Sequence, residues 1–356
     1  MNGVRCMIIR GGTSKGAYFL PEDLPADSAE RDELLLRVMG TPDERQIDGI
    51  GGAHPLTSKV AVVSPSDEAG VDIEYLFLQV GVDKPTVTDR QNCGNLLAGV
   101  APFAIERGLI QPENGEASVR IRMLNTNSIA TARFTVEDGR PVYDGDATIS
   151  GVPGKAAPIY LDFEDTAGGS TGSLLPTGQA VDIVTDLKAT LIDNGMPVVM
   201  IAAGDLGITG YETCSELEAN QELVSVLEEA RLEAGMMMNL GDVSETTVPK
   251  MTMVAPPIAG GHVSTRTFIP HRCHQAIGVL GAVSVATGCL IPGSVGFDVL
   301  SRDNDATSVV IEHPSGTFEA TVELSFDGDS VVVERAGILR TARKLMDGYV
   351  FPRSSS

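Results

Sequence analysis

An internal repeat constrains the fold of this chain more than any other feature. The first copy begins at Gln91-Asn92-Cys93-Gly94-Asn95 and the second at His271-Arg272-Cys273-His274-Gln275. An apolar, helix-like run follows each cysteine, and a glycine, Gly108 or Gly288, lies 15 residues after it (108 − 93 and 288 − 273). A chain that builds the same half twice is expected to close the halves over a cleft, with one cysteine on each lip.

The similarity continues on both sides of the two expected helices. The strand-like run at 118–122 has a counterpart at 308–312, and the run at 58–63 has one at 249–254. Apolar helices that end at a glycine resemble one another in many proteins. The shared order of elements nevertheless indicates a duplication, with loops that differ in length.

The length of the chain also favours two domains, because 356 residues exceed one ordinary core. We expect an N-terminal domain at 1–182, joined by a returning strand at about 340–356, and a second domain at 183–339. In each domain, several strands would surround one central apolar helix, at 94–107 in the first domain and at 274–287 in the second. This pattern predicts the α+β class rather than alternating βαβ units.

Charge and cysteine content limit the partners and the compartment. A net charge of −22 argues against nucleic acid and anionic membranes as partners. A small anion is still possible, because that field is screened beyond about 10 Å. Five scattered cysteines do not form a disulfide framework, and no apolar run approaches the ~18 residues of a membrane helix. We therefore expect a cytoplasmic protein in a reducing compartment.

Two residues are candidates for acid–base chemistry. Cys93 is expected at a helix start, where backbone N–H groups favour an anion and raise the thiolate content of a cysteine. Its polar flanks, Asn92, Gly94 and Asn95, favour this interpretation over a buried, inert thiol. Lys59 starts an otherwise apolar strand. The pattern fits a desolvated lysine that acts as a base and also fits a lysine that extends to solvent at a strand end.

Three further features are candidates for binding an anion. The turn at 11–16 lacks the order of a Walker A loop, but Thr13 and Ser14 could form an anion-binding nest or a plain turn. Arg266, on the strand before the second helix, could hold a carboxylate or lie exposed. The histidines near Cys273 lack the paired spacing of a zinc site, so no metal is expected.

The longer motifs resemble the PrpF family of allylic isomerases, which has the diaminopimelate epimerase-like superfold of two pseudo-symmetric, hot-dog-like domains around an active-site cleft. Within this family the chain is most similar to the enzymes that act on 4-oxalomesaconate in bacterial breakdown of gallate, protocatechuate and lignin aromatics. The motifs that carry the resemblance are Arg10-Gly11-Gly12-Thr13-Ser14-Lys15-Gly16, Gln46-Ile47-Asp48-Gly49-Ile50-Gly51-Gly52, Leu56-Thr57-Ser58-Lys59-Val60-Ala61, Asn92-Cys93-Gly94-Asn95 and Arg340-Thr341-Ala342-Arg343.

The resemblance implies a 1,3-proton shift that moves a double bond in an unsaturated polycarboxylate, without a cofactor. Lys59 and Cys93 would be catalytic, and a homodimer is possible. We expect the substrate to be bound by Thr13, Ser14, Ser58, Asn92, Gly94, Asn95, Arg266, Cys273 and His274.

Other functions remain open at this point. The substrate could instead be 2-methylaconitate or 3-methylitaconate, which other members of the family isomerise. An amino-acid racemase or epimerase would use Cys93 and Cys273 as a pair of thiols. A protein that binds polycarboxylates without catalysis is the alternative that is not an enzyme.

Overall fold

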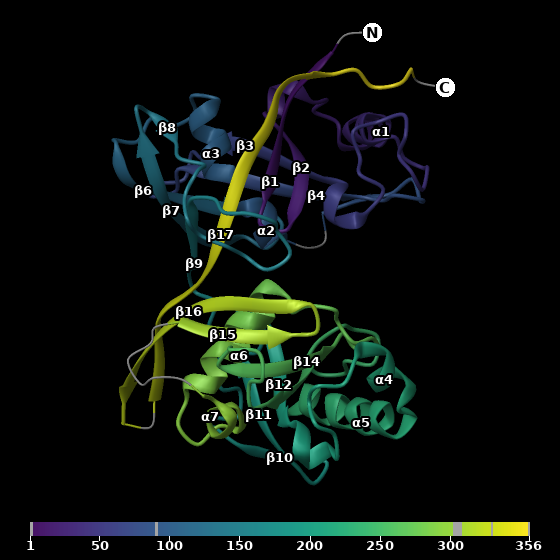
Figure 1. Cartoon of the computed structure of the whole chain (residues 1–356), viewed down its shortest axis with the longest axis vertical. Coiled ribbons are helices and arrows are strands. Elements are labelled where there is room, and N and C mark those ends of the chain that lie inside the picture. The colour runs from purple at the N-terminus through teal and green to yellow at the C-terminus, as the bar shows by residue number, and fades with distance from the viewer. Residues whose placement is uncertain (1–2, 90–91, 302–307, 329, 355–356) are drawn as a thin grey trace. The chain divides into compact units, whose positions relative to one another are not determined.

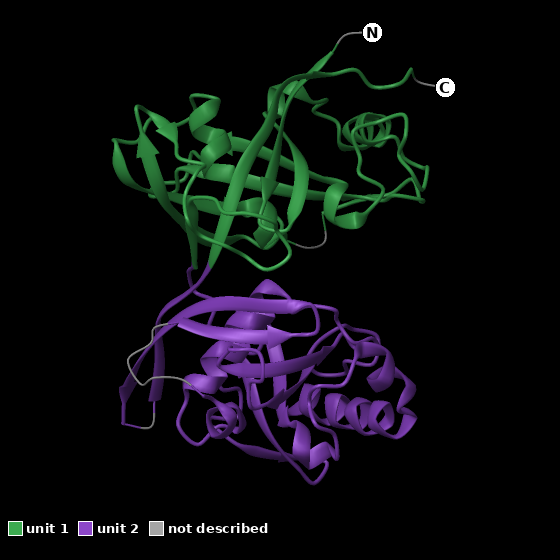
Figure 2. Cartoon of the chain, in the orientation of Figure 1, with its two compact units in different colours: residues 1–162, 339–356 green, residues 163–338 purple. Residues whose placement is uncertain are grey.

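The chain divides into two units, which are described separately: residues 1–162 with 339–356, and residues 163–338 (Figure 2). The computed structural model describes residues 3–89, 92–301, 308–328 and 330–354. No helix among these residues is long and apolar enough to cross a membrane.

The boundary between the units lies about 20 residues before the one that we predicted, at Asp162 rather than 182. The segment after it is held by strand β11 (Leu187–Asp193) of unit 2. The Asp193 carboxylate accepts hydrogen bonds from the backbone N–H groups of Ser170 (2.8 Å) and Thr171 (3.1 Å). This glycine-rich stretch therefore belongs to unit 2, although its composition is that of a linker.

The strands of unit 1 pair in a closed series. β17 pairs with β1, and the series continues through β2, β3, β4, β6, β7 and β9 back to β17. Closure leaves the sheet without an open edge. The elements are β1 (Val4–Gly11), β2 (Ser14–Phe19), η1 (Pro21–Asp23), α1 (Ser28–Met39), η2 (Pro55–Thr57), β3 (Lys59–Pro65), β4 (Ile73–Val80), β5 (Val87–Thr88), α2 (Gly94–Leu97), α3 (Val100–Glu106), β6 (Gly115–Met123), β7 (Ser128–Glu137), β8 (Arg140–Pro141), β9 (Pro158–Phe163) and β17 (Ser330–Val350) (Figure 1).

Side chains alternate along the strands of unit 1, so the sheet has two faces, and both are apolar. α1 begins at the Asp27 cap, ends at Gly40 in the left-handed conformation, and packs on one face with side chains that include Val60 and Leu78. Successive strand residues point to opposite faces. Lys59 therefore lies on the other face, where α2 and α3 contact β1, β2, β3 and β4.

The helix expected at 94–107 is two short helices. α2 ends at Leu97, and α3 begins at Val100 after Gly99. Pro102 explains the break, because it has no N–H to donate to the carbonyl of Ala98 and its ring disfavours a continuous helix there. Gly99 is required at the break, since a Cβ would lie 2.4 Å from the Tyr18 hydroxyl.

Unit 2 repeats the order of pairings that surrounds the helix in unit 1. In unit 1, the pairs β2–β3, β3–β4, β4–β6 and β6–β7 are parallel, antiparallel, parallel and antiparallel, and β12–β13, β13–β14, β14–β15 and β15–β16 repeat this order. The elements are β10 (Asp182–Val184), β11, β12 (Pro197–Ala202), η3 (Ala203–Leu206), α4 (Cys214–Ala219), α5 (Gln221–Met237), β13 (Lys250–Ala255), β14 (Val263–Phe268), α6 (Val279–Leu290), α7 (Val295–Val299), β15 (Ser308–His313), β16 (Gly316–Asp327) and the first part of β17.

The second central helix, α6, begins five residues later than expected, at Val279 rather than at 274. The residues before it extend β14 as a tight hairpin, in which Phe268 forms a bridge with Cys273. The His274 N–H donates to the carbonyl of Thr267 at 2.8 Å. This pairing holds the segment in an extended form, so Cys273 does not lie at a helix N-terminus. The chain is mixed α and β, and the hot-dog-like description of its halves stays a prediction.

Candidate active site

Lys59 is a buried amine at the start of a central strand of unit 1. Its side chain is only 6% exposed. Nζ donates to Gln79 Oε1 at 2.8 Å and lies 4.8 Å from the centre of the Phe77 ring. No carboxylate in the described ranges forms an ion pair with it at 4.0 Å or less. A neutral amide and an aromatic face therefore hold this amine.

The Gln79 amide is oriented by three backbone carbonyls. Its Nε2 group contacts the carbonyl oxygens of Pro55 (3.1 Å), Ser58 (3.0 Å) and Val80 (3.2 Å). An amide nitrogen can only donate, so these contacts turn Oε1 toward Lys59. Gln79 thus positions the Lys59 ammonium.

Ser58, which we predicted to bind substrate, contacts the preceding loop through its hydroxyl. It is fully buried, and its hydroxyl lies 2.7 Å from Gln46 Oε1 and 2.9 Å from the carbonyl oxygen of His54. A hydroxyl has one proton to donate, and both neighbours are acceptors. The contacts of Ser58 therefore fix the backbone just before Lys59.

Cys93 is the N-cap residue of α2 and is 9% exposed. Its carbonyl accepts hydrogen bonds from the N–H of Leu97 (3.0 Å) and the hydroxyl of Tyr75 (3.4 Å). The Tyr18 hydroxyl donates to the carbonyl of Leu96 at 2.6 Å. Burial, together with the nearby Cys93, raises the pKa of both tyrosines well above its usual range. Two protonated phenols therefore anchor the turn that carries the thiol.

One face of β4 links the lysine to the cysteine. Tyr75, Phe77 and Gln79 alternate along this strand and so point to the same side. Tyr75 contacts Cys93, while the other two residues contact Lys59. The two predicted catalytic residues are therefore placed on the same face of unit 1 by a single strand.

The glycine-rich turn after β1 packs directly against the start of α2. A Cβ on Gly11 would lie 2.4 Å from the backbone carbonyl oxygen of Asn95. A Cβ on Gly12 would lie 2.2 Å from Asn95 Oδ1. Asn95 Nδ2 donates to Thr13 Oγ1 at 3.1 Å, and its Oδ1 accepts from Arg340 Nε at 3.1 Å. Glycine is required at both positions because the Asn95 bridge occupies the space that a side chain would need.

Arg340 places a buried cation beside this cluster. It is 6% exposed, and burial lowers its pKa to about 10, while nearby Cys93 acts in the opposite direction. A positive charge at this position favours a bound carboxylate. Arg340 belongs to one of the family motifs, but no sequence pattern indicated that it would lie near Cys93.

Two of the predicted binding residues have buried polar atoms without a partner. Ser14 Oγ and Asn92 Oδ1 have no hydrogen-bond partner within the part of the chain that the structure describes. Asn92 Nδ2 donates to Thr126 Oγ1 at 2.5 Å. Gly94 is the first residue of α2. Buried polar atoms are normally paired, so these two oxygens lack the partner expected of them.

The predicted binding residues of unit 2 have structural contacts. Arg266 donates from Nε to the carbonyl of Glu212 (2.6 Å) and from Nη1 to that of Thr265 (2.8 Å). Burial and the neighbouring Cys214 raise the pKa of the Cys273 thiol. His274 Nδ1 accepts from the N–H of Ala276 at 2.8 Å. The structure gives the side chains of all three residues contacts within unit 2.

Several residues around the lysine and the cysteine were not predicted from the sequence, namely Tyr18, Tyr75, Phe77, Gln79 and Arg340. One signal was available: a glutamine continues the inward stripe of strand 73–80, where an apolar residue is expected. In the described ranges, no three His, Cys, Asp or Glu side chains are grouped so that they could hold a metal ion.

Comparison with known proteins identifies the family. The model of the PrpF protein family matches residues 1–353. The (4E)-oxalomesaconate Delta-isomerase of a Novosphingobium species is 58% identical over 99% of this chain and 98% of its own length. The 4-oxalomesaconate tautomerase of Pseudomonas putida is 54% identical, over 98% of this chain and 95% of its own length.

A solved structure agrees with these relatives. The crystal structure of methylitaconate-delta-isomerase is 34% identical and superposes with a TM-score of 0.88, covering 98% of this chain and 95% of that one. With both comparisons extending over nearly the whole length, this chain belongs to the PrpF family.

Proposed function

We propose that the chain is a cofactor-independent allylic isomerase whose substrate is 4-oxalomesaconate, in the bacterial breakdown of aromatic compounds. The observation that carries the proposal is the buried Lys59 amine, held by Gln79 without an ion-pair partner among the described residues. The relatives of this chain that share more than half of its residues are named for the isomerisation of oxalomesaconate.

The proposed reaction is a 1,3-proton shift. The Lys59 amine removes a proton from the carbon next to the double bond, and the electron pair spreads over a dienolate. A proton then returns at the far end of the allyl system, so the double bond moves by one position. No electrons are gained or lost, so the step needs no redox cofactor. Acid–base catalysis of this kind contributes roughly 10²- to 10⁴-fold.

Cys93 and the residues around it would hold the substrate and its growing negative charge. Charge that develops in the transition state is stabilised by donors that are already in place. The Ser14 hydroxyl, the Thr13 hydroxyl and the first backbone N–H groups of α2 can donate to this charge. Asn92 Oδ1 can only accept, so it would face a protonated group. Arg340 supplies the positive charge. We assign Cys93 as the second acid–base group.

The geometry argues against a racemase that uses two thiols. Such an enzyme needs two reactive cysteines, whereas burial and Cys214 raise the pKa of Cys273. Its place in a hairpin also denies it a helix N-terminus. Cys273 and His274 are therefore left out of the proposed site.

The test is proton exchange in D₂O, followed by NMR with 4-oxalomesaconate. Wild-type protein is expected to incorporate deuterium at the allylic positions and to form the shifted isomer. Lys59→Met should abolish both. Full exchange and turnover by Lys59→Met would overturn the assignment of the base. Faster conversion of 2-methylaconitate or 3-methylitaconate than of 4-oxalomesaconate would overturn the substrate.

A further inference from the structure

Unit 1 contains a cavity that the proposed reaction does not use. Its volume is about 290 Å³, and it lies between the loop at 147–156 and strands β1 and β17. Its charged lining residues are Arg10, Lys155 and Arg343, and no acidic residue is among the described residues that line it. This size is near the lower end of the range for small-molecule sites, about 300 to 1,000 Å³.

The cavity lies on the opposite face of the β1–β17 pair from the cluster around Cys93. Arg10 pairs directly with Arg343 in the sheet, so their side chains share one face. Arg340 lies three residues before Arg343, so its side chain points to the other face, where it contacts Asn95. The side chains of Arg10 and Arg340 therefore leave opposite faces of the strand pair, and the cavity loop comes near the other group only at Gly151, where a Cβ would lie 3.2 Å from Thr13 Cγ2.

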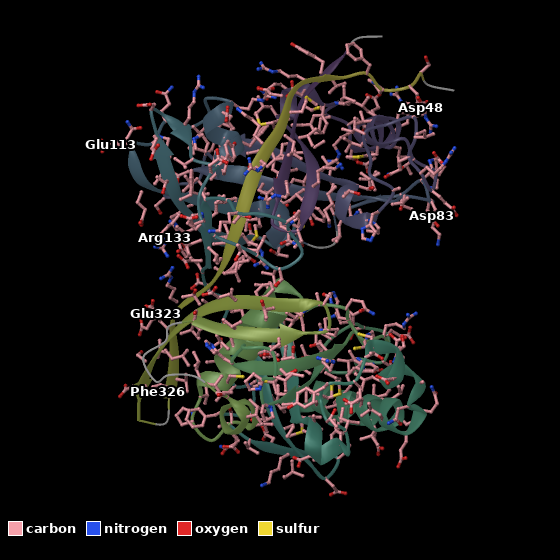
Figure 3. All side chains as sticks on the ribbon, in the orientation of Figure 1. Asp48, Asp83, Glu113, Arg133, Glu323 and Phe326 are labelled. Carbon is pink, nitrogen blue, oxygen red and sulfur yellow. The ribbon has the colours of Figure 1, made fainter. Side chains whose placement is uncertain are left out.

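Three cations lie in register across three adjacent strands on the cavity face. Lys15 of β2 pairs with Arg10 of β1, which pairs with Arg343 of β17. Like charges that are directly opposite destabilise a sheet. The surface elsewhere is rich in acids, such as Asp48 and Asp83 at the periphery of unit 1 (Figure 3). In so acidic a chain, a row of cations indicates that positive charge at this place serves to bind an anion.

The acids near this row only partly neutralise it. Arg343 contacts Asp144 at 3.1 Å and Lys155 contacts Asp146 at 3.1 Å, but these aspartates are 89% and 95% exposed. Exposed ion pairs of this kind contribute little. Burial and Arg343 both lower the pKa of Arg10, which has no acid partner among the described residues.

Arg10 still has donors to offer. Every hydrogen bond found for it in the described part of the chain uses Nη1, which contacts the carbonyl oxygens of Gly12 (2.9 Å) and Thr341 (3.1 Å) and the Thr341 hydroxyl (3.0 Å). These contacts fix the guanidinium plane. The edge formed by Nε and Nη2 matches the two oxygens of a carboxylate.

We propose that this cavity is a binding site for a small organic anion that carries two or more carboxylates, separate from the cluster of Lys59 and Cys93. One carboxylate pairs with Arg10 and Arg343 across the strands, and another pairs with Lys155 on the loop. Both aspartates turn to solvent when the anion binds.

Isothermal titration with citrate tests the proposal. We expect the double variant Arg343→Gln/Lys155→Gln to bind citrate at least tenfold more weakly than wild-type protein. Arg140→Gln removes an exposed arginine of the same unit and should leave the affinity within twofold. Restoring the charges, as Arg343→Lys/Lys155→Arg, should recover most of the affinity. Thermal unfolding of each variant would check that it is folded.

A second variant separates this site from the proposed catalytic site. Asn95→Ala removes the bridge beside Cys93 and should leave binding in the cavity unchanged. If Asn95→Ala loses citrate binding while the double variant keeps it, citrate binds only at the catalytic site and the cavity proposal is wrong. Failure of wild-type protein to bind millimolar citrate would overturn it as well.

Discussion

The two units place a lysine at the same point of the same strand pattern but surround it differently. Lys59 begins β3 and Lys250 begins β13. Lys59 Nζ donates to a side-chain amide, whereas Lys250 Nζ donates to the backbone carbonyl of Thr247 at 2.5 Å. Burial and, to a smaller extent, the nearby charge of Arg231 lower the pKa of Lys250 to about 8. The two units therefore share the strand order, while the contacts of the two amines differ.

The two cysteines differ in the same way. Cys93 is the N-cap residue of α2, whose first turn accepts hydrogen bonds from the hydroxyls of Tyr18 and Tyr75. Cys273 lies in a hairpin beside the thiol of Cys214. Burial and Cys214 raise the pKa of the Cys273 thiol, which favours its neutral form. We therefore expect the proton chemistry to be confined to unit 1.

The largest effect should come from exchanging the lysines. We expect Lys59→Met to lower kcat/KM by about 10³-fold or more, because it removes the base. Lys250→Met should stay within about threefold of wild type, since Lys250 is not in the proposed site. The measurement is the initial rate with 4-oxalomesaconate. Equal losses in the two variants would break the comparison.

The cysteines should show a smaller contrast. Cys93→Ser is expected to reduce kcat by about 10²-fold, because a serine hydroxyl is a far weaker acid than a thiol. Cys273→Ser should retain most of the activity. If both substitutions abolish proton exchange, the racemase-like use of two thiols has to be reconsidered.

Lys250 should also leave a signature in the pH dependence of stability. The folded state releases this proton near pH 8, whereas the unfolded chain keeps it to about pH 10.4. The unfolded state binds more protons between these values, so the group's contribution to stability rises with pH. We expect the stability of wild type relative to Lys250→Met to increase by roughly 2–3 kcal/mol between pH 7 and pH 10.5. Urea unfolding at several pH values measures this difference, and a constant difference would contradict it.

The smallest predicted effect concerns the anchor of the turn that carries Cys93. Tyr18→Phe leaves the carbonyl of Leu96 without the hydroxyl donor and should lower the free energy of unfolding by about 1–2 kcal/mol. Tyr349→Phe is the matched control, because Tyr349 is 60% exposed and should change stability by less than about 0.5 kcal/mol. Denaturant melts of the two variants compare them directly.

Much of the strand pattern could be predicted from local sequence, and the side-chain partners could not. The strand-like runs at 58–63 and 249–254 overlap β3 and β13, because short apolar runs are a local signal. The predicted start of α6 was wrong because the hydrogen bond from the His274 N–H to the carbonyl of Thr267 holds the preceding residues in a hairpin. The contact of Gln79 with Lys59 depends on the register between β3 and β4, which no single strand reveals.

The environment of Cys93 was predictable only in part. The Asn-Cys-Gly-Asn sequence indicated a helix start with polar neighbours, as found. Arg340 lies 245 positions from Asn95, so only the folded chain brings its charge there. Chemistry that is assembled across such separations is not encoded in any local motif.

Strand β17 imposes an order on how the protein can be made. Residues 342–350 pair with β1 and close the ring of unit 1, yet they follow the whole of unit 2 in the chain (Figure 2). When synthesis has reached Asp162, the sheet of unit 1 therefore still lacks one strand. β1 can pair with β17 only after residues 163–338 have been synthesised. Unit 2 can begin to fold during this interval, so the half that carries the proposed chemistry is the last to be completed.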